Sequence, residues 1–400
     1  MKSVLSIQSH VVHGYVGGRA AIFPLQTQGW EVDNINTVHF SNHTGYGHFK
    51  GQKLDRQELR SILDQLVNQL QIEYGAVVTG YAPNAELISC IREYIVAMKE
   101  KSRSKVIQKS GSESGNGQSE LRDAGSTSTT PSLIYLMDPV MGDNNYMYVD
   151  QSCVDEYRKL IHSDVVDIIT PNQFELELLM DYEITNRESI KNAIEYLHNQ
   201  CHIPYVVITS VESKVMNMKR DSDDNDDGDI KEEDCIYCVI STKPHPTSNA
   251  QMRMFQIPTI RSYFTGVGDL FSALLLDKFV ANNAGAGSGN VDGHDDLRRL
   301  SRSVNQVLTI MAKTLKLTHK LGMQQAATSA VPDINNNKSL DSNGNHEATV
   351  DTSEIPNGKQ DEIVGKINDG ETMKYFELKV IQAKEFYSYD GEGEFKEMKL

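Results

Sequence analysis

Short apolar runs alternate along the chain with longer segments in which apolar residues recur every three or four positions. The short runs are rich in β-branched residues and predict strands at 3–8, 31–40, 75–81, 133–140, 166–171 and 205–210. The longer segments predict helices at 55–71, 84–101 and 186–201, each opening on an Asp or Asn suited to an N-cap.

Several of these strands are almost entirely apolar, which is typical of a parallel sheet covered on both faces. Repeated strand–helix units predict an α/β fold with a central, mostly parallel sheet and helices on both faces. Ligands of such folds bind outside the carboxyl ends of the strands. We expect one domain over residues 1–400.

Four segments hold too few apolar residues to offset the entropy lost on ordering, and we predict disordered insertions there. They are residues 102–132, 219–234, 282–296 and 325–370. Strand-like alternation returns at 373–386, so the fold is expected to resume after the last insertion.

The formal charge of −16 is concentrated, since residues 221–234 hold nine acidic residues and one lysine. No basic patch predicts a nucleic-acid partner, and no apolar run approaches the length of a membrane span. The N-terminus makes a poor signal peptide, and five cysteines fit free thiols. We therefore expect a cytoplasmic protein, possible also in the nucleus, without nucleic-acid or membrane partners.

The first candidate site is the stretch GVGDLFSALLL, in which Gly266, Gly268 and Asp269 precede an apolar helix. Backbone N–H groups at a helix start attract a phosphoryl group, and an aspartate there can accept a proton from an attacking hydroxyl. A turn followed by a capped core helix explains the same residues, and the stretch alone leaves both interpretations open.

Polar residues also lie at or just after the ends of three predicted strands. Asn172 and Glu175 lie three apart, which fits either a carboxylate that holds the waters of Mg²⁺ or a capping box. Other strand ends carry acids and hydroxyls that meet a ligand or only form turns; they are Asp138, Asp143, Thr209 and Ser210.

The N-terminal glycines Gly14, Gly17 and Gly18 do not form G-x-G-x-x-G, so a dinucleotide site is poorly supported. The segment FSNHTGYGHFKG (40–51) mixes hydroxyls with aromatic rings, which suits a flat polar ring as ligand.

Taken in order, these blocks resemble pyridoxal kinase, of the ribokinase-like superfamily. LSIQSHVVHGYVGG, FSNHTGYGHFKGQ, VVTGYAP, DPVMGD, DIITPNQFELELL, VVITS and GVGDLFSALLL carry the resemblance, with YFELKVIQAKEF similar to the last strand of the family. The resemblance covers nearly everything outside the four insertions and implies transfer of the ATP γ-phosphoryl group to the 5′-hydroxyl of pyridoxal, with pyridoxine and pyridoxamine as further substrates.

The resemblance also implies residue roles. Asp269 would be the catalytic base, beside an anion hole formed by the backbone of Gly266, Val267 and Gly268. The pyridine ring would be held by Ser9, Thr44, Val16, Phe40 and Tyr81. ATP would be bound by Asp143, Tyr148, Thr170, Asn172, Thr209, Ser210, Gly266 and Val267. The metal region would include Asp138, Thr170 and Glu175.

Family resemblance further implies Mg²⁺ or another divalent cation with ATP, a monovalent cation such as K⁺, and a homodimer. Many members have threonine where this chain has Val267, which bears on rate, and the loop between Asp143 and Tyr148 is short. A slow regulatory or binding paralogue and a hydroxymethylpyrimidine kinase of the same fold are the alternatives.

Overall fold

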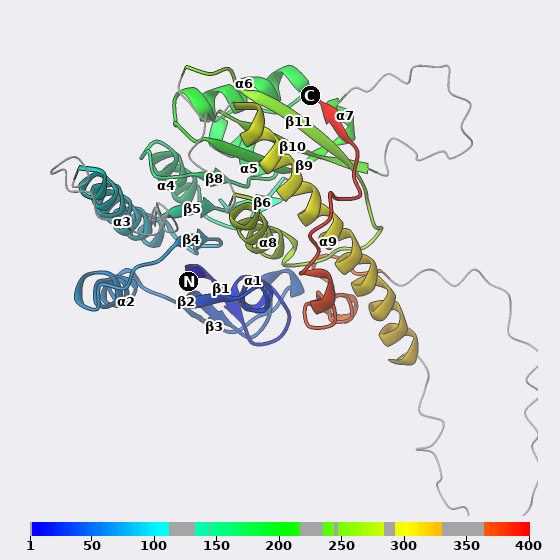
Figure 1. The fold of residues 1–400 in the computed structure, drawn as a ribbon. Coiled ribbons are helices and arrows are strands. Elements are labelled where there is room, and N and C mark those ends of the chain that lie inside the picture. Colours follow the sequence, from blue (N-terminus) through cyan, green and yellow to red (C-terminus); the bar gives the residue numbers. More distant parts are fainter. Residues whose placement is uncertain are drawn as a thin grey trace, which may run out of the picture.

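The structure, a computed structural model, describes residues 2–111, 133–143, 145–216, 235–243, 247–283, 293–329 and 364–400. These residues contain one large sheet. Its strands are β1 (Lys2–Val11), β2 (Trp30–Phe40), β3 (Gly51–Lys53), β4 (Ala76–Thr79), β5 (Ile134–Met137), β8 (Ile168–Ile169), β9 (Tyr205–Glu212), β10 (Cys235–Thr242), β11 (Gln251–Pro258) and β12 (Glu397–Lys399). The order across the sheet is β12-β11-β10-β9-β8-β5-β4-β1-β2-β3 (Figure 1).

The strands from β9 to β2 pair in parallel, whereas β3 and β10 to β12 pair antiparallel. β1 lies between β2 and β4, so the strand order reverses there. Such a reversal opens a crevice at the carboxyl ends of the strands, where α/β folds bind their ligands.

Helices cover both faces of the sheet, as predicted (Figure 1). One face packs against α2 (Arg56–Leu63), α3 (Ala85–Gly111), α4 (Gln151–Ile161), α5 (Gln173–Met180) and α6 (Arg187–Asn199). The other packs against α1 (Gly18–Thr27), α8 (Val267–Asn283) and α9 (Gly293–Ser329). The remaining helical pieces are η1 (Thr44–Tyr46), the π-helical η2 (Asp64–Gln69), α7 (Ser213–Met216), α10 (Gly370–Met373) and η5 (Lys384–Phe386).

The apolar strands predicted this double covering. Val77 and Val78 are adjacent in β4 and both fully buried, yet they belong to the two opposite cores, because neighbouring side chains in a strand point to opposite faces. The three predicted N-caps are confirmed: Asp55, Asn84 and Asn186 each accept a hydrogen bond from the backbone N–H three residues later, at 2.8–2.9 Å.

The predicted insertions were too wide at three places. α3 runs to Gly111, inside the predicted insertion 102–132. Once a helix has formed, each added residue gains a hydrogen bond at little further cost, so a polar end can continue a packed helix. For the same reason α8 and α9 occupy the ends of 282–296, and α9 occupies the start of 325–370. The remaining parts of the four predicted insertions lie outside the described residues: 112–132, 219–234, 284–292 and 330–363.

The prediction of a strand at 373–386 was wrong. This segment contains the end of α10, turns and η5. Leu378, Val380 and Ala383 are fully buried against the α8–α9 core, and the Ala383 N–H donates locally to the Lys379 carbonyl. The alternation of apolar residues therefore reflects three contacts with helices. The last strand is β12, which follows the red segment beside α9 (Figure 1).

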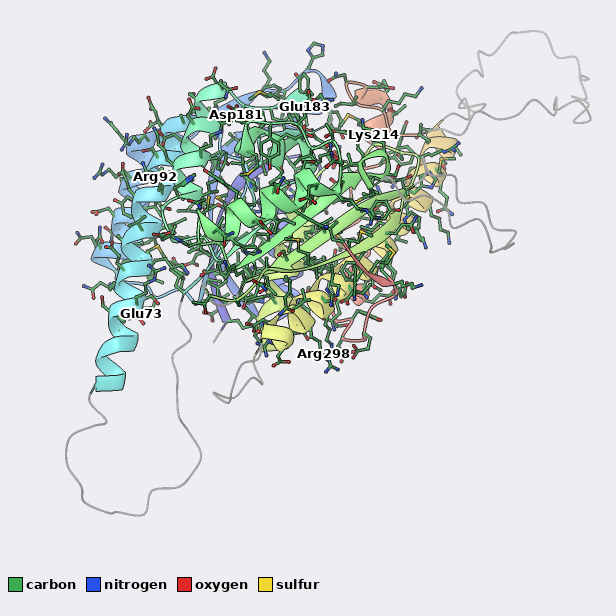
Figure 2. All side chains as sticks on the ribbon, turned by 90° about the horizontal axis from the view of Figure 1, so that it is seen from above. Glu73, Arg92, Asp181, Glu183, Lys214 and Arg298 are labelled. Carbon is green, nitrogen blue, oxygen red and sulfur yellow. The ribbon has the colours of Figure 1, made fainter. Side chains whose placement is uncertain are left out.

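Charged side chains of both signs lie around the outside of the molecule, including Glu73, Arg92, Asp181, Glu183, Lys214 and Arg298 (Figure 2). All five cysteines are free and buried, and Cys235 and Cys238 both lie in β10. Among the described residues, no helix combines the length and apolarity needed to cross a membrane.

Candidate active site

The start of α8 presents backbone donors at the carboxyl end of the sheet. Gly266 immediately precedes the helix with φ 76°, and a Cβ on it would lie 2.0 Å from the carbonyl oxygen of Tyr15. Only glycine satisfies both the dihedral angle and the contact. Val267 and Gly268 form the first turn, where N–H groups have no acceptor within the helix, and Gly268 is exposed. This arrangement suits an anion.

Asp269 lies in the same turn and is held from another part of the chain. Its Oδ2 accepts a hydrogen bond of 2.7 Å from the N–H of Gly17. Gly17 has φ 55°, and a Cβ there would lie 2.1 Å from the carbonyl oxygen of Ser9. The end of β1, the start of α1 and the start of α8 therefore meet at this carboxylate. Burial raises its pKa, while the Gly17 hydrogen bond lowers it in part.

Asp138 follows β5 and lies in the interior of the site, 4% exposed. Its Oδ2 accepts a hydrogen bond of 3.2 Å from Ser272, whose hydroxyl is also 3.1 Å from that of Thr170. Burial and the nearby Asp269 carboxylate raise the pKa of Asp138 to about 8. Two acids from different elements therefore share one environment.

Asn172 and Glu175 form the capping box of α5: the Asn172 side chain accepts from the Glu175 N–H, and Glu175 Oε2 accepts from the Asn172 N–H. The box also fastens the next loop, because Glu175 Oε1 accepts from Met141 N–H and Asn172 Nδ2 donates to the Gly142 carbonyl. Burial and Asp138 raise the pKa of Glu175 well above its usual range. The capping box and the carboxylate site thus coexist.

Three carboxyl groups meet in this site without a basic partner: Asp138 and Glu175 are buried, and Asp269 is half-buried. Burial raises all three pKa values, a neighbouring carboxylate adds to the rise for Asp138 and Glu175, and no basic side chain of the described residues lowers them. The described residues contain no group of three or more His, Cys, Asp or Glu placed to bind a metal ion directly. A cation here would use one or two carboxylates together with waters and phosphate oxygens, which is the coordination that Mg²⁺ prefers.

Hydroxyls predicted to meet ATP lie at the neighbouring strand ends. Thr170 follows β8 and is buried, and Thr209 in β9 donates its N–H to the Pro171 carbonyl at 2.9 Å. Ser210 follows Thr209 and is half-buried. These positions place the three hydroxyl residues along β8 and β9, beside the capping box.

The short loop after Asp143 forms a hairpin of β6 (Gly142–Asp143) and β7 (Tyr146–Met147). Tyr148 follows it and donates its N–H to the Met141 carbonyl at 2.8 Å. The hydroxyls of Tyr148 and Tyr263 form a hydrogen bond in which either group can be the donor. Burial, Tyr263 and Asp143 raise the pKa of Tyr148. The hairpin is thereby joined to the segment that leads into Gly266.

The residues predicted to surround a ring also assemble. Val16, Phe40 and Tyr81 form one apolar cluster with Val11 and Val38. The sequence had not indicated Val11 or Val38 as members of this group. Ser9 is buried nearby on β1, and its hydroxyl and carbonyl lie against Gly17. Thr44 begins η1 and is exposed. Val16 of this cluster directly precedes Gly17, the residue whose N–H binds Asp269.

Four further residues that the sequence did not indicate shape the site: Ser272, Gln8, Tyr263 and Glu377. Ser272 lies three residues after Asp269, so helical spacing could have placed it on the same face. Gln8 is fully buried; its Nε2 has no hydrogen-bond partner, and Gly80 lies against both Gln8 and Asp269. No sequence pattern pointed to Tyr263 or Glu377.

Comparisons with known proteins bear on this geometry. Residues 125–236 match the family described as phosphomethylpyrimidine kinase. The Saccharomyces cerevisiae protein named "Putative pyridoxal kinase BUD16" is 38% identical over 80% of this chain and 85% of its own. The pyridoxal kinase of Ovis aries is 35% identical over 68% of this chain and 76% of its own.

The chain belongs to the pyridoxal kinase family. A solved structure of pyridoxal kinase from Leishmania donovani in complex with ADP and pyridoxamine covers 100% of both chains, with a TM-score of 0.67 and 25% identity. The ribokinase-like fold expected from the sequence is thus confirmed.

Proposed function

We propose that this protein is an ATP-dependent pyridoxal kinase that phosphorylates the 5′-hydroxyl of pyridoxal. One observation carries the proposal: Asp269 is fixed by the Gly17 N–H between the donor-rich start of α8 and the apolar cluster of Val16, Phe40 and Tyr81. A base, an anion site and a ring pocket therefore meet at one carboxylate.

In the proposed reaction, the 5′-oxygen of pyridoxal forms a bond to the γ-phosphorus as the bond to the β–γ bridging oxygen breaks. The hydroxyl proton passes to Asp269, and ADP leaves. Burial raises the proton affinity of Asp269, which makes it a stronger base than a solvated aspartate. The backbone of Gly266, Val267 and Gly268 would donate to the phosphoryl group in transfer, since this chemistry depends on positioning and charge stabilisation.

ATP would lie along the ends of β8 and β9, against Asn172, Thr170, Thr209 and Ser210, with Asp143 and Tyr148 on the hairpin beside it. A divalent cation such as Mg²⁺, when bound, neutralises charge on the phosphates, and Asp138, Thr170 and Glu175 would hold it or its waters. The clustered carboxyl groups, which have no basic partner among the described residues, support that fit, because a bound cation would favour their ionised forms. Membership of the family also supports a monovalent cation such as K⁺ and a homodimer. Light scattering of the purified protein would test the homodimer.

Hydroxymethylpyrimidine kinase activity is the second candidate, favoured by the match of residues 125–236 to the phosphomethylpyrimidine kinase family. The ring of that substrate is also flat, polar and hydroxymethylated, so the same base and anion site could serve it.

A panel of acceptors tests the proposal. Purified protein is incubated with ATP, Mg²⁺ and K⁺, together with pyridoxal, pyridoxine, pyridoxamine, hydroxymethylpyrimidine or no acceptor, and ADP release and phosphorylated product are measured. We expect the highest kcat/KM with pyridoxal or its two relatives. Preference for hydroxymethylpyrimidine would move the assignment to the second candidate. Binding of pyridoxal and ATP without product would indicate the regulatory paralogue.

A further inference from the structure

Glu377 lies far from the other site residues in sequence but contacts two loops of the proposed pyridoxal pocket. It ends a segment, residues 364–377, that we call the C-terminal strap. The side chain is buried, 5% exposed. Its Oε2 accepts a 3.0 Å hydrogen bond from the Tyr15 N–H, and its Oε1 accepts a 2.7 Å hydrogen bond from the Tyr46 hydroxyl.

The two hydrogen bonds connect the two parts of the pocket. Tyr15 immediately precedes Val16, which belongs to the apolar cluster proposed as the ring wall, and Gly17, whose N–H binds Asp269. Tyr46 ends η1, the turn that begins at Thr44. One carboxylate therefore fixes the distance between the loop that positions the base and the turn that faces the ring.

The backbone near Glu377 is shaped around its carboxylate. Gly14 has φ 94°, and a Cβ there would lie 2.5 Å from Glu377 Oε2, so the loop approaches as closely as a glycine allows. Among the described residues, Glu377 forms no ion pair, and its buried charge is offset by hydrogen-bond donors. A buried carboxylate costs free energy unless it is well hydrogen-bonded, which makes it a poor choice for packing alone.

The rest of the strap follows the same loops. The Asn368 N–H donates to the Gly45 carbonyl at 2.8 Å, and the ring of Tyr46 lies 3.2 Å from where a Cβ on Gly370 would be. At the other end of the strap, the Tyr263 N–H donates to the Gly365 carbonyl at 2.9 Å. The red segment in Figure 1 accordingly lies beside the blue N-terminal strands.

We propose that Glu377 is a positioning residue that holds the Tyr15 loop and the Tyr46 turn in the arrangement that binds pyridoxal. The inference rests on the proposed kinase function. It deepens that function because a residue outside both loops would control the affinity for the pyridine ring of pyridoxal. Apart from Gly266 and Val267, the proposed ATP residues lie on β8, on β9, at the start of α5 and on the hairpin, and Glu377 contacts none of them directly. We therefore expect Glu377 to act on pyridoxal binding far more than on ATP binding.

Three variants test this. Glu377→Leu removes both acceptors at similar size, and we expect the KM for pyridoxal to rise about 10- to 100-fold, as for loss of hydrogen bonds to a charged group. The KM for ATP should change less than about threefold. Glu377→Gln should recover most of the loss, since its amide oxygen accepts from Tyr15 and its NH₂ donates to the Tyr46 hydroxyl. Tyr46→Phe, at a half-buried position, should raise the pyridoxal KM about three- to tenfold.

Glu377→Leu combined with Tyr46→Phe should be no worse than Glu377→Leu alone, because the shared hydrogen bond is already absent. Glu371→Gln is the matched control: it changes an exposed carboxylate of the same strap that pairs with Lys374, and should leave both KM values unchanged. Wild type inactive on every acceptor would refute the kinase assignment itself. If wild type is active, two results would overturn the role of Glu377 alone. One is an unchanged pyridoxal KM in Tyr46→Phe and Glu377→Leu, and the other is an equal rise of the pyridoxal and ATP KM values in these variants.

Discussion

Replacing Asp138 by asparagine should make the ligand-free protein more stable at alkaline pH and less active. The carboxyl group is 4% exposed, and burial with the Asp269 charge raises its pKa to about 8. The unfolded chain loses this proton near pH 4 and the folded chain near pH 8. Between these values the folded state holds more protons, so this group makes stability fall as pH rises from about 4 to about 8.

The size of the effect follows from that interval. Four pH units at about 1.4 kcal/mol each give a penalty of about 5 kcal/mol for the ionised group at pH 8 and above. Asparagine removes the charge, but its buried NH₂ must find new acceptors, for which the Ser272 and Thr170 hydroxyls have to turn, at a cost of about 1–3 kcal/mol. We therefore expect Asp138→Asn to gain about 2–4 kcal/mol at pH 8.5 and to be no more stable than wild type at pH 4.5.

Urea unfolding of nucleotide- and metal-free protein at pH 4.5, 6.5 and 8.5 measures this. Asp181→Asn serves as the control, since that side chain is 84% exposed and asparagine suits its φ of 63°. Adding ATP and Mg²⁺ should stabilise wild type more than Asp138→Asn, and kcat/KM of the variant should fall at least about tenfold. Parallel pH profiles for wild type and Asp138→Asn would refute the reasoning, because they would mean that Asp138 carries no penalty.

Two further predictions concern the loops around the site. Gly266→Ala should lower the free energy of unfolding by more than about 3 kcal/mol, because its Cβ would meet the Tyr15 carbonyl, whereas Gly29→Ala, at φ 81° with open space around it, should lose only about 1–2 kcal/mol by the same urea assay. Equal losses would contradict the contact. Tyr148→Phe, which removes the hydrogen bond between the Tyr148 and Tyr263 hydroxyls, should raise the KM for ATP several-fold and increase ADP release without pyridoxal. Unchanged values for both would argue against a closing role for the hairpin.

The sequence predicted the strands and helices best where local chemistry decided them. The sequence analysis predicted the apolar strands β4 and β5, the capped helices and the helix of the α8 stretch. Apolar periodicity, N-cap residues and β-branched residues favour a strand or helix through contacts between residues a few positions apart. The segment 373–386 failed because its apolar residues pack onto α8 and α9 at turns, and alternation alone cannot tell that packing from a strand. The long polar ends of α3 and α9 failed because a helix once packed continues without apolar residues.

The candidate site was predictable as a set of strand ends but not as a network. Asp138 and Asp269 were both predicted, yet their mutual repulsion exists only because the fold brings β5 and α8 together in a buried setting. The capping box of α5 was predicted as an alternative to a ligand site, and in the structure one carboxylate serves the box and the buried acid cluster together. Glu377 and Tyr263 were missed because nothing local marks a residue whose partners lie a hundred or more positions away.

The most direct test of the account is pyridoxal 5′-phosphate formation by wild type and Asp269→Asn, followed by absorbance with ATP, Mg²⁺, K⁺ and pyridoxal. Asparagine keeps an oxygen to accept the Gly17 N–H but cannot take the proton, so we expect pyridoxal and ATP to bind normally while kcat falls by about two orders of magnitude or more. A variant that turns over at the rate of wild type, or a wild type that binds both substrates and forms no product, would contradict the assignment of Asp269 as the base of a pyridoxal kinase.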